Sequence, residues 1–92
     1  MYVGRIVGTV VATRKDTTLV GTKLLIVQPL NLTLRPTEEA RVMVDTVGAG
    51  VGELVIFATG TAARNALNKK DSAADAAIIG IVDKFETNDH WI

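Results

Sequence analysis

The sequence has no cysteine, no net charge and few aromatic side chains, and each absence excludes a class of function. Without cysteine the chain can form neither a disulfide framework nor a thiolate zinc site, and it offers no cysteine nucleophile. Ten basic side chains balance ten acidic ones, so the positive charge with which a nucleic-acid binder contacts phosphates is missing. The four aromatic residues are too few for a base-stacking surface, whereas the abundant Val, Ile, Leu and Ala suit packing.

The N-terminal stretch MYVGRIVGTVVATRK also lacks the features of a leader peptide or a membrane span. It has no basic region before its apolar part, Arg5 lies inside it, and Gly4 and Gly8 interrupt it. We therefore expect a cytosolic protein. At 92 residues the chain is long enough for one domain with a modest core, near the size at which association with further copies helps stability.

Short β-type runs separated by turn signals fill most of the chain. We predict strands at residues 2–13, 23–28, 39–45, 53–58 and 76–83. The first run is apolar on both faces: Gly4, Ile6, Gly8 and Val10 are expected to share one of them, and the two glycines are expected to let the strand bend sharply. The second strand is expected to end at Pro29, because proline cannot donate to a central ladder.

A single short helix is predicted at residues 61–67, where the Ala-rich segment TAARNAL favours helix and the Thr61 hydroxyl can cap free N–H groups. Five short strands and one short helix predict a mainly β fold, a small five-stranded, partly open barrel that resembles the OB type. We expect this domain to span residues 1–84 and a C-terminal tail to span 85–92.

The segment DTVGAGVGELV, residues 45–55, places a glycine at every second position between two predicted strands. It is not a dinucleotide-binding fingerprint, because Glu53 occupies the third glycine position and a strand follows instead of a helix. It is not a phosphate-binding P-loop either, since the required lysine and hydroxyl residue are absent. Two interpretations remain: a long hairpin turn that uses positive φ angles, or a surface where neighbouring subunits approach closely.

Few side chains could carry out chemistry. Asp45 and Glu53 flank the glycine segment and could form an acid/base pair, but we expect solvated charges, with Glu53 accepting N–H groups of the segment. His90, the only histidine, is the third residue from the C-terminus, where a frayed end is the expected state. The acidic residues between 71 and 83 are too scattered to predict a metal site. We therefore predict a protein without enzymatic activity, catalytic residues, metal or cofactor.

Three segments, DTVGAGVGELV, GTAARNAL and AAIIGIVDKF, resemble in their order and spacing the EutN/CcmL family, the pentameric vertex proteins of bacterial microcompartment shells. The N-terminal segment matches the first hairpin of the family, so the resemblance extends from Tyr2 to Asp83. It implies an OB-like barrel that forms a homopentamer and caps the vertices of a microcompartment shell in the bacterial cytoplasm. Hexameric shell proteins are the implied neighbours, and no nucleic acid or membrane is expected as a partner.

We also predict where the pentamer makes its contacts. Five copies of one segment that meet around an axis leave little room for side chains, so the glycine segment is expected near the five-fold axis or pore. Its residues there are Gly48, Ala49, Gly50, Val51 and Gly52.

The helix supplies a second predicted contact, either to a neighbouring subunit or to the shell, through Thr61, Arg64 and Asn65. The guanidinium group of Arg64 could bridge an interface, although a solvated helix face accounts for it equally well. The alternative function is an OB-type binding module for a single-stranded nucleic acid or an oligosaccharide. A small enzyme is the third interpretation. Neutral charge and scattered aromatics weigh against nucleic acid.

Overall fold

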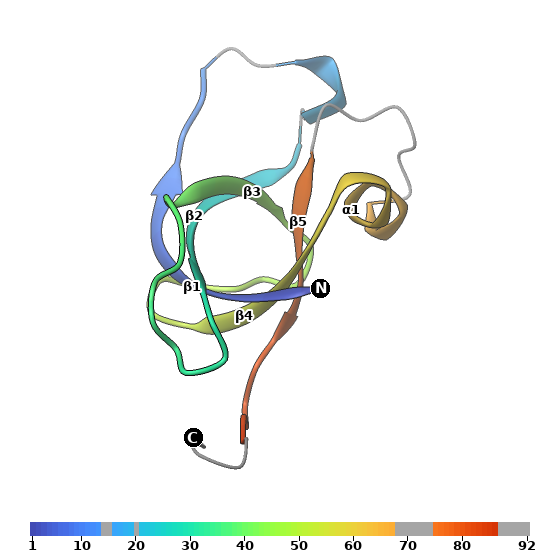
Figure 1. Cartoon of the computed structure of the whole chain (residues 1–92). Helices are drawn as coiled ribbons and strands as arrows, with labels where there is room; N and C mark the ends of the chain where they lie inside the picture. Colours follow the sequence, from blue (N-terminus) through green and yellow to red (C-terminus); the bar gives the residue numbers. More distant parts are fainter. Residues whose placement is uncertain (14–15, 20, 68–74, 87–92) are drawn as a thin grey trace.

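The computed structural model describes residues 1–13, 16–19, 21–67 and 75–86, and these form a closed five-stranded barrel. The elements are β1 (Tyr2–Val10), the 3-10 turn η1 (Thr17–Leu19), β2 (Lys23–Leu30), β3 (Arg41–Asp45), β4 (Leu54–Thr59), α1 (Gly60–Ala66) and β5 (Ala76–Ile81). Around the barrel the strand order is β1-β2-β3-β5-β4, and β4 pairs with β1 (Figure 1). The predicted mainly β barrel with one short helix is confirmed, and its wall is closed instead of partly open.

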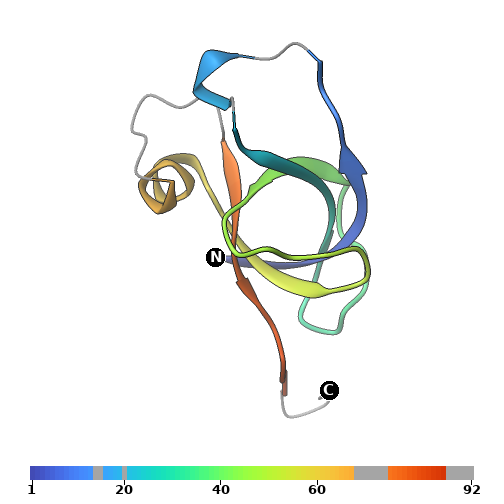
Figure 2. The ribbon, with the colours of Figure 1, turned by 180° about the vertical axis from the view of Figure 1, so that it is seen from behind.

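β5 lies between β3 and β4 in the wall, and its pairing with β3 completes the barrel. This pair is parallel, whereas the other four pairs are antiparallel. The two strands that flank the glycine segment are therefore not paired with each other, and the segment runs across one end of the barrel (Figure 2). The interpretation as a hairpin turn is wrong, because a hairpin joins two strands that pair directly.

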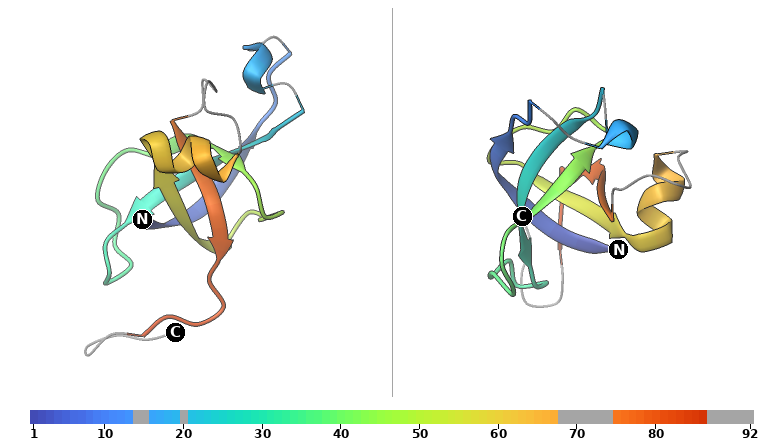
Figure 3. Two further views of the ribbon diagram at one scale, coloured as in Figure 1. Left: turned by 90° about the vertical axis from the view of Figure 1, so that its right-hand side faces the viewer. Right: turned by 90° about the horizontal axis from the view of Figure 1, so that it is seen from above.

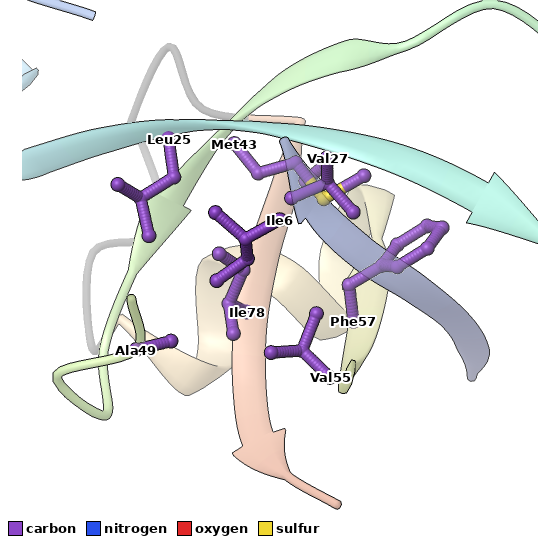
Figure 4. Close-up of a cluster of buried hydrophobic side chains, with 9 residues drawn as sticks. Ile6, Leu25, Val27, Met43, Ala49, Val55, Phe57 and Ile78 are labelled. Atoms are coloured by element: carbon purple, nitrogen blue, oxygen red, sulfur yellow. The ribbon is translucent and has the colours of Figure 1, made fainter. Parts of the chain in front are cut away.

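Inward-facing side chains from all five strands fill the barrel. The cluster of buried residues consists of Ile6, Leu25, Val27, Met43, Ala49, Val55, Phe57, Ala76 and Ile78. Ala49 comes from the glycine segment instead of a strand, and it closes the core at that end of the barrel (Figure 4). The segment is thus part of the core as well as part of the surface.

An irregularity in β1 reverses the faces that the sequence pattern predicts. Ile6 pairs with Val27, but the next pair joins Gly8 to Ile26. Since Val27 and Ile26 are consecutive residues and point to opposite sides of the sheet, Gly8 lies on the outer face and not beside Ile6. Beyond this bulge the predicted alternation is wrong, because one extra residue shifts every later side chain to the other face.

The first glycine of β1 lies where the strand passes close to the core. Gly4 is buried, and a Cβ atom added there would lie 2.5 Å from Cγ1 of Val27 and 3.3 Å from Cε2 of Phe57. Only a residue without a side chain allows β1 to approach the core so closely.

Several predicted strand boundaries are wrong. β1 ends at Val10 instead of residue 13, β3 begins at Arg41 instead of residue 39, β4 is displaced by one residue, and β5 ends at Ile81 instead of residue 83. Pro29 lies inside β2, paired with Gly4. Because β2 pairs with β3 only as far as Val27, the missing N–H of the proline removes no hydrogen bond on that side.

The helix also begins earlier than predicted. Its N-cap residue is Thr59, which makes no side-chain capping bond, so the predicted cap at Thr61 is wrong. The chain enters α1 directly from β4, and Thr61 therefore falls inside the helix, where its hydroxyl accepts a hydrogen bond from Arg64 Nη2 at 3.4 Å. Ala63 is fully buried where α1 packs against β4 and β5. Within the described ranges, no helix is both long and apolar enough to cross a membrane.

The Val82 N–H still donates to the Leu54 carbonyl of β4 at 2.8 Å, and beyond it residues 83–86 extend away from the barrel (Figure 3). The predicted boundary between domain and tail at residues 84 and 85 stays a prediction. His90 and the rest of residues 87–92 lie outside the described residues.

Candidate subunit-contact surface

The carboxylate of Asp45 holds the first half of the glycine segment. Its Oδ1 accepts the Val47 N–H at 3.0 Å, and its Oδ2 accepts the Ala49 N–H at 3.0 Å. The Asp45 side chain is 2% exposed and its Oδ2 lies 3.9 Å from Nζ of Lys23, which also donates to the Ala49 carbonyl. The expectation of a solvated Asp45 is therefore wrong, because the pairing of Lys23 with Asp45 places this side chain at the closed end of the barrel.

Glu53 holds the second half of the segment in the predicted way. Its Oε1 accepts the Gly50 N–H at 2.6 Å, and its own N–H donates to the Gly50 carbonyl at 3.1 Å. Both carboxylates that could have formed an acid/base pair thus bind backbone N–H groups of the segment. Charged acceptors form the stronger class of hydrogen bond, so these contacts stabilise one conformation of the backbone.

β1 fixes the end of the segment that leads into β4. The Gly52 N–H donates to the Ile6 carbonyl at 2.8 Å, and the Ile6 N–H donates to the Glu53 carbonyl at 3.0 Å. Nη1 of Arg5 donates to the Gly52 carbonyl at 2.9 Å. No local pattern in the sequence marks Arg5 or Lys23, because their partners lie 47 and 26 residues away along the chain.

The anchored segment presents small and aliphatic groups to the outside. Val47 and Val51 are 38% and 63% exposed, and Gly48 is exposed between them. Gly48 and Gly52 adopt φ angles of 78° and 93°, which few other residues tolerate. The φ of Gly50 lies outside this left-handed region, so a backbone requirement does not account for its identity. The result is a rigid apolar cap over one end of the barrel.

The three predicted helix residues lie elsewhere. Thr61 and Asn65 are exposed and Arg64 is half-buried on α1. α1 follows the C-terminal end of β4, whereas the glycine segment precedes its N-terminal end, so β4 separates the two sets. The structure does not bring them into one site.

The opposite end of the barrel is a polar hollow of about 300 Å³, lined by Tyr2, Glu38, Arg41, Phe57 and Thr59. The rings of Tyr2 and Phe57 stack with centroids 5.4 Å apart. Phe57 is only 1% exposed, so its ring faces the core and Tyr2 instead of offering a free stacking surface. Among the described residues, no group of three or more His, Cys, Asp or Glu side chains is placed to hold a metal ion.

Comparisons with known proteins agree with the barrel fold. The model of the family described as "Ethanolamine utilisation protein EutN/carboxysome" matches residues 1–83. The chain belongs to the EutN/CcmL family. A bacterial microcompartment shell vertex protein of Rhodospirillum rubrum, GrpN, is 52% identical over 87 residues, which cover 95% of this chain and 98% of GrpN.

Other members of the EutN/CcmL family show similar agreement. The microcompartment shell vertex protein PduN of Salmonella typhimurium is 44% identical over 90% of this chain and 96% of its own length. The solved structure of GrpN, described as a pentameric microcompartment shell protein, superposes with a TM-score of 0.85 at 50% identity over 95% of this chain and 99% of that one. CcmL of Gloeobacter violaceus superposes with a TM-score of 0.89 at 36% identity, over 99% and 94% of the two chains.

Proposed function

We propose that this chain is a structural protein of a bacterial microcompartment shell, in which five copies form a ring that closes a vertex. The observation that carries the proposal is the family match across residues 1–83, together with relatives that are named as shell vertex proteins. The corresponding location is the shell of a microcompartment within the bacterial cytoplasm. We assign no reaction to the chain, because those relatives are named for a place in a shell and not for a substrate.

The glycine segment is the part of the chain that we place near the five-fold axis. Its anchoring by Asp45, Glu53 and β1 supports this placement, because a ring of five copies requires the same backbone conformation in each copy. The exposed Val47 and Val51 supply apolar surface for contact between copies, and Gly48 adds no side chain to the crowded space.

The exposed face of α1 is proposed as a contact to a neighbouring subunit or to surrounding hexameric shell proteins. Thr61 and Asn65 are open to solvent, and Arg64 can extend its five N–H donors toward carbonyl or carboxylate groups of another chain. The binding-module alternative is not proposed. Neither the relatives nor the neutral charge of the chain supports it.

Native mass spectrometry of the purified chain tests the proposal. We expect a species of about 49 kDa, five times the 9.8 kDa of one chain, at micromolar concentration. A monomer as the only species under these conditions would contradict the proposed function.

A further inference from the structure

The polar hollow at the end of the barrel opposite the cap holds an acidic and a basic side chain that are not paired with each other. Its volume is about 300 Å³, and its lining consists of Tyr2, Glu38, Arg41, Phe57 and Thr59. Figure 4 shows Phe57 at the far end of the buried cluster from Ala49 of the cap. A volume at the lower end of the range for ligand pockets fits a small molecule.

Three of the four polar groups that line the hollow are available to a ligand. Among the described residues, the carboxylate of Glu38 and the hydroxyl groups of Tyr2 and Thr59 have no hydrogen-bond or ion-pair partner. Thr59 is the N-cap residue of α1 and still makes no side-chain capping bond. Together these groups supply acceptors and donors that converge on one space.

Arg41 is the fourth polar group, and its one ionic contact within the described part of the chain is weak. Its Nη2 lies 3.8 Å from Oδ2 of Asp75, whose side chain is 77% exposed. An exposed ion pair of this length adds little stability, so a carboxylate that reaches the guanidinium group can take the place of Asp75. The planar guanidinium group binds a carboxylate through two parallel N–H donors.

The fold fixes the backbone that carries the two charged residues. Arg41 is the first residue of β3 and pairs with Val27 of β2. Nε2 of Gln28 donates to the Glu38 carbonyl at 2.7 Å, which ties the connection before β3 to β2. Because both positions are held before a ligand arrives, binding has to order little more than the side chains.

Two aromatic rings form the apolar part of the hollow. The rings of Tyr2 and Phe57 stack with centroids 5.4 Å apart and an angle of 25° between their planes. Phe57 is 1% exposed and supports the ring of Tyr2, which is 55% exposed. An aliphatic group of a ligand can therefore pack on Tyr2 while its polar groups contact Glu38 and Arg41. Apolar walls with a few placed polar groups are typical of small-molecule sites.

We propose that the polar hollow binds a small zwitterion of the free amino acid class, whose carboxylate contacts Arg41 and whose ammonium group contacts Glu38. A ligand with both charges satisfies both side chains, whereas an anion alone is repelled by Glu38 and a cation alone by Arg41. For the same reason a phosphate-rich chain does not fit this hollow. One chain supplies all five lining residues, so this inference is independent of the proposed ring.

Titration of the purified protein with three related probes tests the requirement for both charges. L-leucine carries both, N-acetyl-L-leucine has no ammonium group, and L-leucinamide has no carboxylate. We expect L-leucine to bind with a Kd of about 1 mM or lower, and each analogue to bind at least about tenfold more weakly, because each lacks one charge-assisted contact. Saturation-transfer difference NMR at constant ionic strength measures the three affinities.

Two variants assign the binding to the polar hollow. Glu38→Gln is expected to weaken L-leucine at least about tenfold and to leave N-acetyl-L-leucine unchanged, because that probe has no ammonium group to lose a partner. Arg41→Gln is expected to weaken L-leucine similarly and to leave L-leucinamide unchanged. Glu39→Gln and Arg35→Gln are the matched controls, since both residues are exposed and neither lines the hollow. Circular dichroism checks the folding of each variant first.

Each contrary result overturns the inference. The inference fails if L-leucine does not bind the folded parent chain, if Glu38→Gln or Arg41→Gln leaves its affinity intact, or if the three probes bind equally well. If Arg41→Gln does not fold, Glu38→Gln carries the test alone, because Glu38 is exposed and lies outside the strands. None of these results depends on the formation of pentamers, which native mass spectrometry decides separately.

Discussion

The glycines of the segment that caps the barrel serve different physical purposes. Gly48 and Gly52 have left-handed φ angles of 78° and 93°, and an added Cβ at either position would meet no atom within 4 Å. Replacing either glycine is therefore expected to cost backbone strain, without a steric clash of the new side chain. Gly50 has no such φ, and a Cβ there would lie 3.4 Å from Oε1 of Glu53. The regularly spaced glycines of the segment therefore differ: Gly48 and Gly52 are needed for their φ angles, and Gly50 is not.

Replacement by alanine separates these requirements. Gly52→Ala is expected to lower the free energy of unfolding by about 1 kcal/mol or more per chain, because an L-residue is strained at a left-handed φ. Gly50→Ala is expected to change it by less, since its backbone is unstrained. Urea unfolding of both variants at equal protein concentration provides the comparison. Equal losses would show that φ is not what selects glycine at position 52.

At the scale of an element, the cap behaves as a structured part of the barrel and not as a free loop. Asp45 binds two of its N–H groups, Glu53 binds a third, and Ala49 completes the core. A buried donor that loses its acceptor costs the full desolvation of that group. The stability of the cap therefore depends on two carboxylates that flank it in the sequence.

The two carboxylates differ in a way that can be measured. Asp45→Asn leaves only one oxygen for the two N–H groups of Val47 and Ala49, and its NH₂ group would face a donor. We expect a loss of about 1–3 kcal/mol in the free energy of unfolding. Glu53→Gln keeps an oxygen for its single N–H partner and is expected to cost less. A thermal denaturation series at fixed concentration tests this order, and a larger loss for Glu53→Gln would refute it.

At the scale of the whole molecule, the outward-facing side chains of the barrel bear on how copies associate, as the buried side chains bear on the fold. The apolar face of β3 points outward, whereas its other face supplies Met43 to the core and places Arg41 and Asp45 at the two ends of the barrel. The exposed valines of the cap and membership in the EutN/CcmL family both favour association of several copies.

The proposed position of the cap near the five-fold axis gives an assembly prediction. Gly50→Leu is expected to fold, because Gly50 needs no left-handed φ, but to form fewer pentamers, because its side chain is repeated five times around the axis. Gly50→Ala is the matched control with a much smaller side chain. The pentamer fractions of both variants come from native mass spectrometry at equal concentration, with circular dichroism as the check of folding. A leucine variant as pentameric as the parent would place the cap away from the axis.

Local patterns in the sequence determined the class of fold. Short β-type runs between turn signals located all five strands, the Ala-rich segment located the helix, and the position of Glu53 indicated its bond to the glycine segment. These features depend on neighbouring residues, so they can be read along the chain. Three quoted segments also indicated the family, whose model matches residues 1–83.

Only the tertiary structure decided which side of each strand faces the core. A bulge at Val7 exchanged the faces of β1, and the parallel pairing of β3 with β5 turned a supposed hairpin into a cap across the barrel. The burial of Asp45 and its contact with Lys23 likewise depend on pairing between distant segments. These pairings depend on closure of the whole wall, because the register of each strand is fixed by its two neighbouring strands together.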